Sequence, residues 1–148
     1  MWSFSYEDFL VGEVSGAEKI EWDRYASDSQ AATFSHYFFW SEALSATCDL
    51  PVFRLAARCR QGEQRLAGIL PLMLFAAPNR EVRLISLPYS DAAGIAADNE
   101  DVGRALLAGA LALADHLGAV HVELRQAGAW LSLSWRLASL FFQTRYNR

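Results

Sequence analysis

Hydrophobic and polar positions along the chain follow two rhythms, one typical of strands and one typical of helices. Residues 9–14 (FLVGEV) and 82–87 (VRLISL) are short apolar runs that predict strands. Residues 52–60 (VFRLAARCR) alternate, which predicts a strand with one buried face. Residues 65–77 (RLAGILPLMLFAA) are apolar on both faces and predict a central strand, in which Pro71 marks a bulge or a local edge. The polar turn QGEQ between these last two segments predicts a hairpin.

Two segments in the first third of the chain have helical spacing. Residues 17–28 (AEKIEWDRYASD) lie between Ser-Gly and Asp-Ser boundaries, which predicts a helix there. Its apolar positions are Ile20, Trp22 and Tyr25. Residues 35–48 (SHYFFWSEALSATC) begin with Ser35, a suitable N-cap, and predict a second helix with a wide apolar face. That face consists of Phe38, Phe39, Trp40, Ala43 and Leu44.

The clearest helical pattern covers residues 98–118 (DNEDVGRALLAGALALADHLG). Asp98 or Asn99 can cap its first turn, and Gly118 is a natural residue to follow its last turn. Its buried stripe is expected to be Leu106, Leu107, Ala110, Leu111 and Ala114. Residues 119–125 (AVHVELR) alternate again and predict a final strand. Strands and helices mixed in this order predict an α/β (α+β) domain with a mixed central sheet flanked by helices.

The composition changes sharply after residue 125. All 17 acidic residues lie at or before Glu123, and residues 126–148 (QAGAWLSLSWRLASLFFQTRYNR) contain none. The sequence therefore divides into a domain at residues 1–125 and an atypical tail at residues 126–148. Two interpretations of the tail remain open. It is either an amphipathic helix over residues 129–142 or the remnant of a truncation or frameshift.

Composition excludes several classes of protein. The 148 residues are 53% hydrophobic, enough for a packed core, and their formal net charge of −4 argues against a DNA-binding protein. The longest apolar run of interest, LLAGALALADHL, is too short for a membrane span, and the N-terminus has no signal-peptide pattern. Cys48 and Cys59 match no zinc framework, and we expect two reduced thiols in a cytoplasmic protein.

Familiar catalytic motifs are absent from the sequence. There is no G-x-S-x-G elbow and no metal-ligand spacing, and the positions of His36, His116 and His121 favour structural roles. The segment RLAGIL at residues 65–70 is the nearest match to R/Q-x-x-G-x-G/A, the phosphate-binding loop of CoA-dependent N-acetyltransferases. It ends in leucine and lies within a predicted strand, where no helix N-terminus is available to a pyrophosphate, so we interpret it as a chance match.

The segment SLPYSDAAG at residues 86–94 is the remaining candidate site. Pro88 ends the preceding strand, Gly94 permits positive φ, and polar side chains lie between them. Strand ends that precede a helix are where α/β folds place ligands. Residue types alone nevertheless favour a simple turn, in which Asp91 caps its own backbone, rather than a ligand site.

Four segments, taken in order, resemble FemAB-like proteins. These segments are ATFSHYFFW, LAGILPLML, SLPYSDAAGIAADNEDVGRALL and LGAVHVELR. FemAB-like proteins are relatives of the peptidoglycan aminoacyl-transferases and contain two tandem acyltransferase domains of the GNAT fold. The branch most similar to this chain is the one found with exosortase and exopolysaccharide systems. The resemblance covers residues 8–125 and only the N-terminal half of such a protein.

This resemblance implies a GNAT-like acyl-CoA N-acyltransferase fold and a reaction. An acyl or aminoacyl group would pass from acyl-CoA or an aminoacyl-tRNA to an amine of a cell-wall or exopolysaccharide precursor. Tyr89, Ser90 and Asp91 are expected to line the substrate cleft, and no catalytic residue is assigned. The family often has Tyr-Gly-Gly where this chain has residues 92–94 (AAG), so the role of that tyrosine does not carry over. Without the second half, we expect the chain to be inactive alone.

Two other functions remain open at this point. The domain could be a non-catalytic interaction module that docks a partner, or forms a homodimer, through the apolar residues 130–142 of its tail. It could instead be an independent small GNAT enzyme that uses CoA. The missing pyrophosphate loop counts against this last interpretation.

Overall fold

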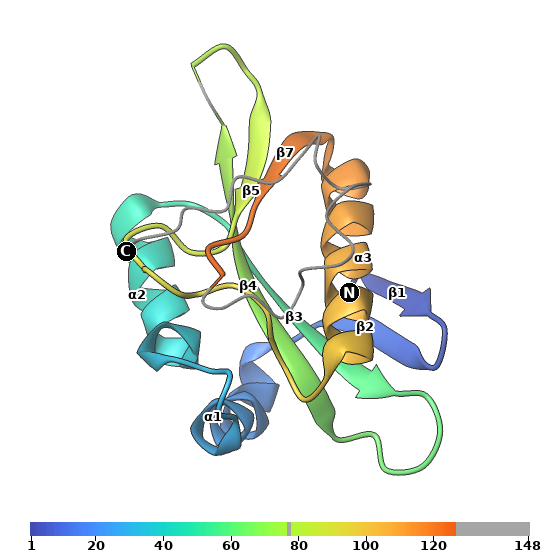
Figure 1. Cartoon of the computed structure of the whole chain (residues 1–148). Helices are drawn as coiled ribbons and strands as arrows, with labels where there is room; N and C mark the ends of the chain where they lie inside the picture. The colour runs from blue at the N-terminus through green and yellow to red at the C-terminus, as the bar shows by residue number, and fades with distance from the viewer. Residues whose placement is uncertain (77, 127–148) are drawn as a thin grey trace.

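The computed structural model of this protein describes residues 1–76 and 78–126. Within these residues, one seven-stranded sheet has the order β1-β2-β3-β4-β5-β7, and the short β6 pairs with β4 (Figure 1). The strands are β1 (Ser3–Tyr6), β2 (Phe9–Glu13), β3 (Val52–Cys59), β4 (Leu66–Ala76), β5 (Val82–Ile85), β6 (Ala96–Ala97) and β7 (Ala119–Glu123). The helices are α1 (Lys19–Asp28), α2 (Phe38–Cys48) and α3 (Glu100–Leu117), with 3-10 turns η1 (Gly16–Glu18) and η2 (Phe34–His36). The predicted mixed sheet flanked by helices is confirmed.

Strand directions explain how β7 comes to form one edge of the sheet. Neighbouring strands from β1 to β5 are antiparallel, whereas β5 and β7 are parallel, with Ile85 opposite Glu123. Parallel neighbours need a crossover connection, and α3 provides it. The hairpin strand β1 was not predicted, because its four residues are too few to reveal a pattern. The tail at residues 127–148 lies outside the described residues.

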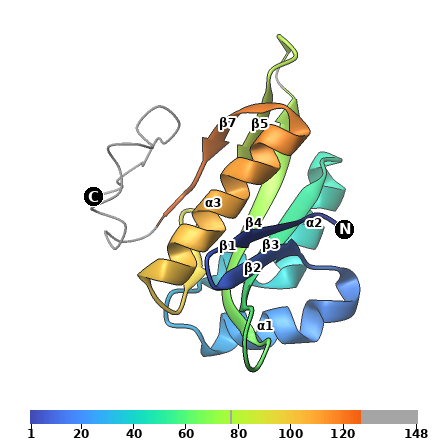
Figure 2. The ribbon, with the colours of Figure 1, turned by 90° about the vertical axis from the view of Figure 1, so that its right-hand side faces the viewer.

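Helices cover both faces of the sheet (Figure 2). The helix α3 packs on one face, where Val11, Leu55, Leu70 and Leu106 are fully buried in the larger core cluster. The helices α1 and α2 lie on the other face, where a second cluster includes Trp22. Burial on both faces explains why β4 reads as apolar throughout, and it confirms the prediction of a central strand.

The start of α2 differs from the prediction. Ser35 is not its N-cap, because it lies in η2 and the helix begins at Phe38. The free amide of Phe38 instead donates to Oδ1 of Asp23 in α1 at 2.7 Å. By contrast, Asn99 caps α3 by accepting from the amide of Val102 at 3.0 Å, as predicted.

Three side chains expected on buried helix stripes are more exposed than the pattern suggested. Ile20 is 76% exposed, Phe39 is 43% exposed and Leu111 is 37% exposed. Each lies well around its helix from the buried side chains, which include Trp22, Phe38 and Leu106. The periodicity therefore locates the centre of each buried stripe better than its width.

Pro71 lies at a local edge of β4. On one side of β4, β6 pairs at residues 68–69 and β5 pairs at residues 73–76, which leaves a gap around Pro71. The amide of Leu74 donates to the carbonyl of Pro51 on the β3 side at 3.0 Å. Alternation directs the nitrogen of Pro71 toward the gap, where its missing hydrogen removes no sheet bond. The local edge is confirmed. The bulge lies elsewhere, opposite Ala57 and Arg58 of β3, where Ala67 is the extra residue in β4.

Two negative expectations also bear on the described residues. None of the helices within residues 1–76 and 78–126 combines the length and apolarity that a bilayer span requires. Cys48 and Cys59 are both free thiols.

Candidate functional site

The loop at residues 86–99 connects β5 to α3 and contains the predicted site. Its outer side is held by three hydrogen bonds from η2 and its flanks. The indole Nε1 of Trp40 donates to the hydroxyl of Ser90 at 2.8 Å. The hydroxyl of Thr33 donates to the carbonyl of Ala92 at 2.7 Å. The third bond comes from His36, and together these contacts fix the loop against the start of α2.

His36 is a buried, neutral support for this loop. Its Nδ1 accepts a hydrogen bond from the amide of Thr33 at 2.9 Å, so the proton resides on Nε2. This Nε2 then donates to the carbonyl of Gly94 at 2.8 Å. Burial lowers the pKa of His36 below its usual value, because the charged imidazolium would be poorly solvated. The geometry therefore agrees with the structural role favoured by the sequence.

The inner side of the loop is held by the chain that follows β7. The amide of Arg125 donates to the hydroxyl of Ser86 at 2.7 Å, and its carbonyl accepts from the amide of Gly94 at 3.0 Å. The side-chain amide of Gln126 bonds both the amide and the carbonyl of Ile95, each at 2.8 Å. These contacts tie residues 125 and 126 to the loop.

Gly94 is required for close approach rather than for its φ angle. Its φ does not lie in the left-handed region, so the positive φ that a glycine permits is not used at Gly94. A Cβ at this position would lie 3.1 Å from the carbonyl oxygen of Arg125 and would collide with the side chain of Gln126. Positive φ occurs instead at Leu87 (30°) and Tyr89 (57°).

The three predicted site residues point in different directions within the loop. Tyr89 is 80% exposed, Asp91 is exposed, and Ser90 is 4% exposed. The hydroxyl of Ser90 accepts from Trp40 and donates to the carbonyl of Pro88 at 3.3 Å. Ser90 is thus engaged in the fold, which leaves Tyr89 and Asp91 accessible to a ligand.

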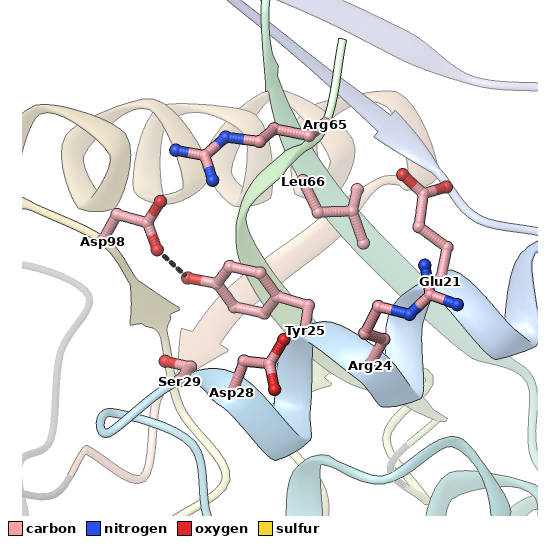
Figure 3. A pocket seen from close by; sticks show the side chains of 8 residues that line it. All are labelled: Glu21, Arg24, Tyr25, Asp28, Ser29, Arg65, Leu66 and Asp98. Atoms are coloured by element: carbon pink, nitrogen blue, oxygen red, sulfur yellow. Dashed lines mark hydrogen bonds between the residues drawn. The ribbon is translucent and has the colours of Figure 1, made fainter. Parts of the chain in front are cut away.

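A pocket of about 400 Å³ lies near the start of β4 and was not singled out from the sequence (Figure 3). It is bounded by α1, by the first residue of β4 and by Asp98, which immediately precedes the N-cap of α3. Its lining residues are Glu21, Arg24, Tyr25, Asp28, Ser29, Arg65, Leu66 and Asp98. The pattern had assigned Tyr25 to an apolar stripe and Asp98 to helix capping, so no local signal united them.

Tyr25 and Asp98 form the hydrogen-bonded centre of this pocket. The hydroxyl of Tyr25 lies 2.9 Å from Oδ1 of Asp98 and 2.9 Å from the carbonyl of Ala67 (Figure 3). Burial and the hydrogen bond to the Asp98 carboxylate raise the pKa of Tyr25 well above its usual value. The phenol therefore keeps its proton near neutral pH and acts as a donor rather than a base.

The charged side chains of the pocket are only partly paired. Glu21 is neutralised by Arg58 of β3, with contacts of 2.6 and 2.8 Å between the carboxylate and the guanidinium. This bidentate contact lowers the pKa of Glu21. Among the residues that the structure describes, Arg24 and Arg65 make no ion pair or hydrogen bond through their side chains.

The N-terminus of α3 does not fit the pyrophosphate of acyl-CoA. A helix N-terminus binds phosphate through free amides, but the side chain of Asn99 already occupies the amide of Val102. Asp98, Glu100 and Asp101 surround this terminus with negative charge, and Arg104 in its first turns already pairs with Glu100 at 2.6 Å. A pyrophosphate at this position would meet repulsion rather than a cradle.

The segment RLAGIL has a packing role instead of a phosphate-binding one. Gly68 lies within β4, and a Cβ there would lie 2.7 Å from Cγ1 of Val102 and 2.8 Å from Cδ1 of Leu106. The glycine thus lets α3 approach the sheet, which agrees with the interpretation as a chance match. Among the described residues, no three side chains of His, Cys, Asp or Glu gather where they could hold a metal ion.

Comparisons with known proteins identify the fold. No protein-family model and no curated protein matches the sequence. An acetyltransferase from Trypanosoma brucei is 13% identical, with a TM-score of 0.61 over 95% of this chain and 96% of that chain. A GNAT family acetyltransferase from Staphylococcus aureus is 11% identical, with a TM-score of 0.57 over 82% and 89%. A transcriptional regulator from Bacillus halodurans is 11% identical, with a TM-score of 0.59 over 95% and 96%. The chain therefore has the GNAT acetyltransferase fold.

Proposed function

We propose that this chain is an N-acyltransferase domain corresponding to the N-terminal half of a FemAB-like enzyme. Its reaction would transfer an acyl or aminoacyl group to an amine of a cell-wall or exopolysaccharide precursor. The observation that carries this proposal is the GNAT fold, with its parallel β5 and β7 joined by α3. The first segment of FemAB-like sequence lies on η2 and the start of α2, and the second lies on β4. The third covers the loop and the start of α3, and the fourth lies on β7.

In this proposal, the loop at residues 86–94 forms one wall of the substrate cleft. Tyr89 and Asp91 are its exposed side chains, and Ser90 holds the loop to Trp40. His36 is neutral and engaged at both ring nitrogens, so it is unsuited to accept a proton from an amine. A wall without a free histidine base agrees with a domain that needs a second half for turnover.

Both acyl donors remain within the proposal. Acyl-CoA would have to place its pyrophosphate away from the N-terminus of α3, for the electrostatic reason given above. An aminoacyl-tRNA would deliver its aminoacyl ester without a pyrophosphate, so the same objection does not apply to it. In either case the amine attacks the acyl carbon and forms an amide, while the CoA thiol or the ribose hydroxyl of the tRNA leaves with the proton that the amine loses. The protein contributes orientation and exclusion of water.

The test begins with the coding DNA beyond the codon for Arg125, translated in all three frames. A frame that continues into a second acyltransferase-like half would allow the joined protein to be made and compared with the 148-residue chain. We expect the joined protein to transfer a labelled acyl group to an amine-bearing cell-wall precursor, and the short chain to transfer none. Asp91→Asn should lower turnover, and Asp115→Asn on the exposed surface of α3 serves as the matched control.

Two results would contradict this proposal. Saturable micromolar binding of acetyl-CoA by the 148-residue chain, with turnover, would identify an independent small GNAT enzyme. Failure of the joined protein to act on any amine with either donor would remove the acyltransferase assignment altogether.

A second candidate function is supported by an exposed aromatic cluster near the loop. Phe34 is 60% exposed, and its ring centroid lies 5.3 Å from that of Phe39 and 5.5 Å from that of Trp40. Exposed aromatic surface of this kind is typical of docking sites. In this alternative, the chain is a non-catalytic module that docks a partner or self-associates through its tail, and the exposed aromatic cluster would be part of the contact surface. Sedimentation analysis tests it, because Trp135→Ala should then weaken association and Asp91→Ala should leave it unchanged.

A further inference from the structure

We propose that the pocket between α1, β4 and α3 binds a small zwitterion that carries both a carboxylate and an ammonium group, such as a free amino acid. The inference deepens the proposed function and takes its chemical meaning from it, since an ammonium group is the protonated form of an acceptor amine. Binding itself is measured without any acyl transfer. The argument rests on which charges around the pocket are paired and which are not.

Two arginines of the pocket can bind an anion, and Figure 3 shows Arg65 near Asp98 and Arg24 near Glu21. Arg24 projects from α1 and Arg65 from the residue before β4, and both line the cavity (Figure 3). Within residues 1–76 and 78–126, neither guanidinium has a carboxylate partner within ion-pair distance. A planar guanidinium binds a carboxylate through two parallel hydrogen bonds, which makes a ligand carboxylate the natural partner here.

The carboxylates of Asp98 and Asp28 can bind a cation. Asp98 accepts one hydrogen bond, from the neutral hydroxyl of Tyr25 to Oδ1, and within the described part of the chain no cation pairs with it. Asp28 also lines the cavity, beside Ser29 (Figure 3), and within residues 1–76 and 78–126 its side chain makes no ion pair or hydrogen bond. Two carboxylates with unused oxygens favour a ligand that donates several hydrogen bonds, as an ammonium does.

Charge balance distinguishes a zwitterion from simpler ligands. Glu21 pairs with Arg58, which also contacts Glu18, and the other charged groups that line the pocket are two carboxylates, Asp28 and Asp98, and two guanidinium groups. A phosphate would be attracted by the arginines but repelled by both carboxylates, and a simple amine would meet the opposite conflict. A ligand with separated charges and no net charge can pair with both the arginines and the aspartates. The volume of about 400 Å³ is in the range of small-molecule sites.

The experiment is a titration of the ¹⁵N-labelled chain with glycine, followed by NMR. We expect saturable shifts at the amides of Arg24, Tyr25, Ser29 and Asp98. Acetate, methylamine and inorganic phosphate are titrated separately. Each should bind about tenfold more weakly than glycine, because it can pair with only the arginines or only the aspartates. Arg65→Gln and Asp98→Asn should each weaken glycine binding by about tenfold. Arg60→Gln, an exposed substitution outside the pocket, is the matched control for charge.

Several outcomes would overturn the inference. One is no saturable shift up to about 100 mM glycine, a concentration that would reveal even millimolar affinity. Others are shifts confined to residues outside the pocket, or phosphate binding as tight as that of glycine. If glycine binds here and the joined protein transfers no acyl group, the proposed function fails while this site stands. If transfer occurs and glycine leaves the pocket unperturbed, the site fails and the function stands.

Discussion

Replacing Gly68 with alanine tests whether this glycine serves packing or ligand binding. The added Cβ would lie 2.7 Å from Cγ1 of Val102, 2.8 Å from Cδ1 of Leu106 and 3.2 Å from the carbonyl oxygen of Ala96. Val102 is 1% exposed and Leu106 is fully buried, so neither side chain has free space into which to rotate. The substitution must therefore move α3 away from β4 or force these side chains off their rotamers.

The expected magnitude follows from two opposing effects. Overpacking a buried site by one methyl group costs about 1–3 kcal/mol. Removing a glycine from a strand returns about 0.4–1 kcal/mol, because the unfolded chain loses conformational freedom. The net loss in the free energy of unfolding is thus about 1–2 kcal/mol. For a domain of this size, that loss lowers Tm by about 2–8 °C.

Urea unfolding followed by tryptophan fluorescence measures this loss. Gly16→Ala is the matched control, because a Cβ at Gly16 meets no atom within 4 Å and should leave stability unchanged or slightly higher. Val102→Ala in the Gly68→Ala background should restore part of the lost stability, since it removes the contacted methyl groups. An alanine variant as stable as the wild type, but with weakened acetyl-CoA binding, would refute this reasoning and revive RLAGIL as a phosphate loop.

Two further predictions concern the loop. Gly94→Ala should break both Gln126 hydrogen bonds to Ile95 and speed hydrogen exchange at the loop amides, at a cost of about 1–3 kcal/mol; unchanged exchange at Ile95 would contradict the close approach to Arg125. The free energy of unfolding should fall as the pH drops below about 6.5. The reason is that His36 binds a proton in the unfolded chain but stays neutral when it is buried in the folded chain. The slope should be at most about 1.4 kcal/mol per pH unit. Urea unfolding between about pH 7.5 and 5.5 measures this slope, which His116→Gln should preserve, and a flat profile would contradict it.

Elements with local signals were predictable from the sequence. The helix α3 begins after Asn99 and ends before Gly118 because a side-chain cap and a residue at φ 69° act on their immediate neighbours. Ser35 shows where such rules fail. It satisfies the local rule for an N-cap, but Asp23 of another helix captures the amide that the cap would have used. The start of α2 is therefore decided by tertiary contact rather than by the adjacent sequence.

The loop was predictable in position but not in the roles of its side chains. Pro88 and Gly94 indicated a turn between a strand and a helix, and that turn is present. The partners that decide its conformation are distant in sequence: Trp40 is 50 residues from Ser90, and Gln126 is 31 residues from Ile95. No periodicity reports such pairs. The pocket illustrates the same limit, since Tyr25 and its hydrogen-bond partner at position 98 are 73 residues apart.

The hydrogen bonds between the loop and the chain after β7 have a consequence for biosynthesis. The ribosome makes Ile95 well before Gln126, 31 residues later, which supplies both side-chain bonds to it. The amide of Gly94 likewise lacks its hydrogen-bond acceptor until the carbonyl of Arg125 has been made. During translation the sheet from β1 to β5 can assemble from neighbouring strands, while the loop lacks the contacts on its inner side. The segment that we propose as a cleft wall therefore acquires its final shape only after residue 126 has emerged from the ribosome.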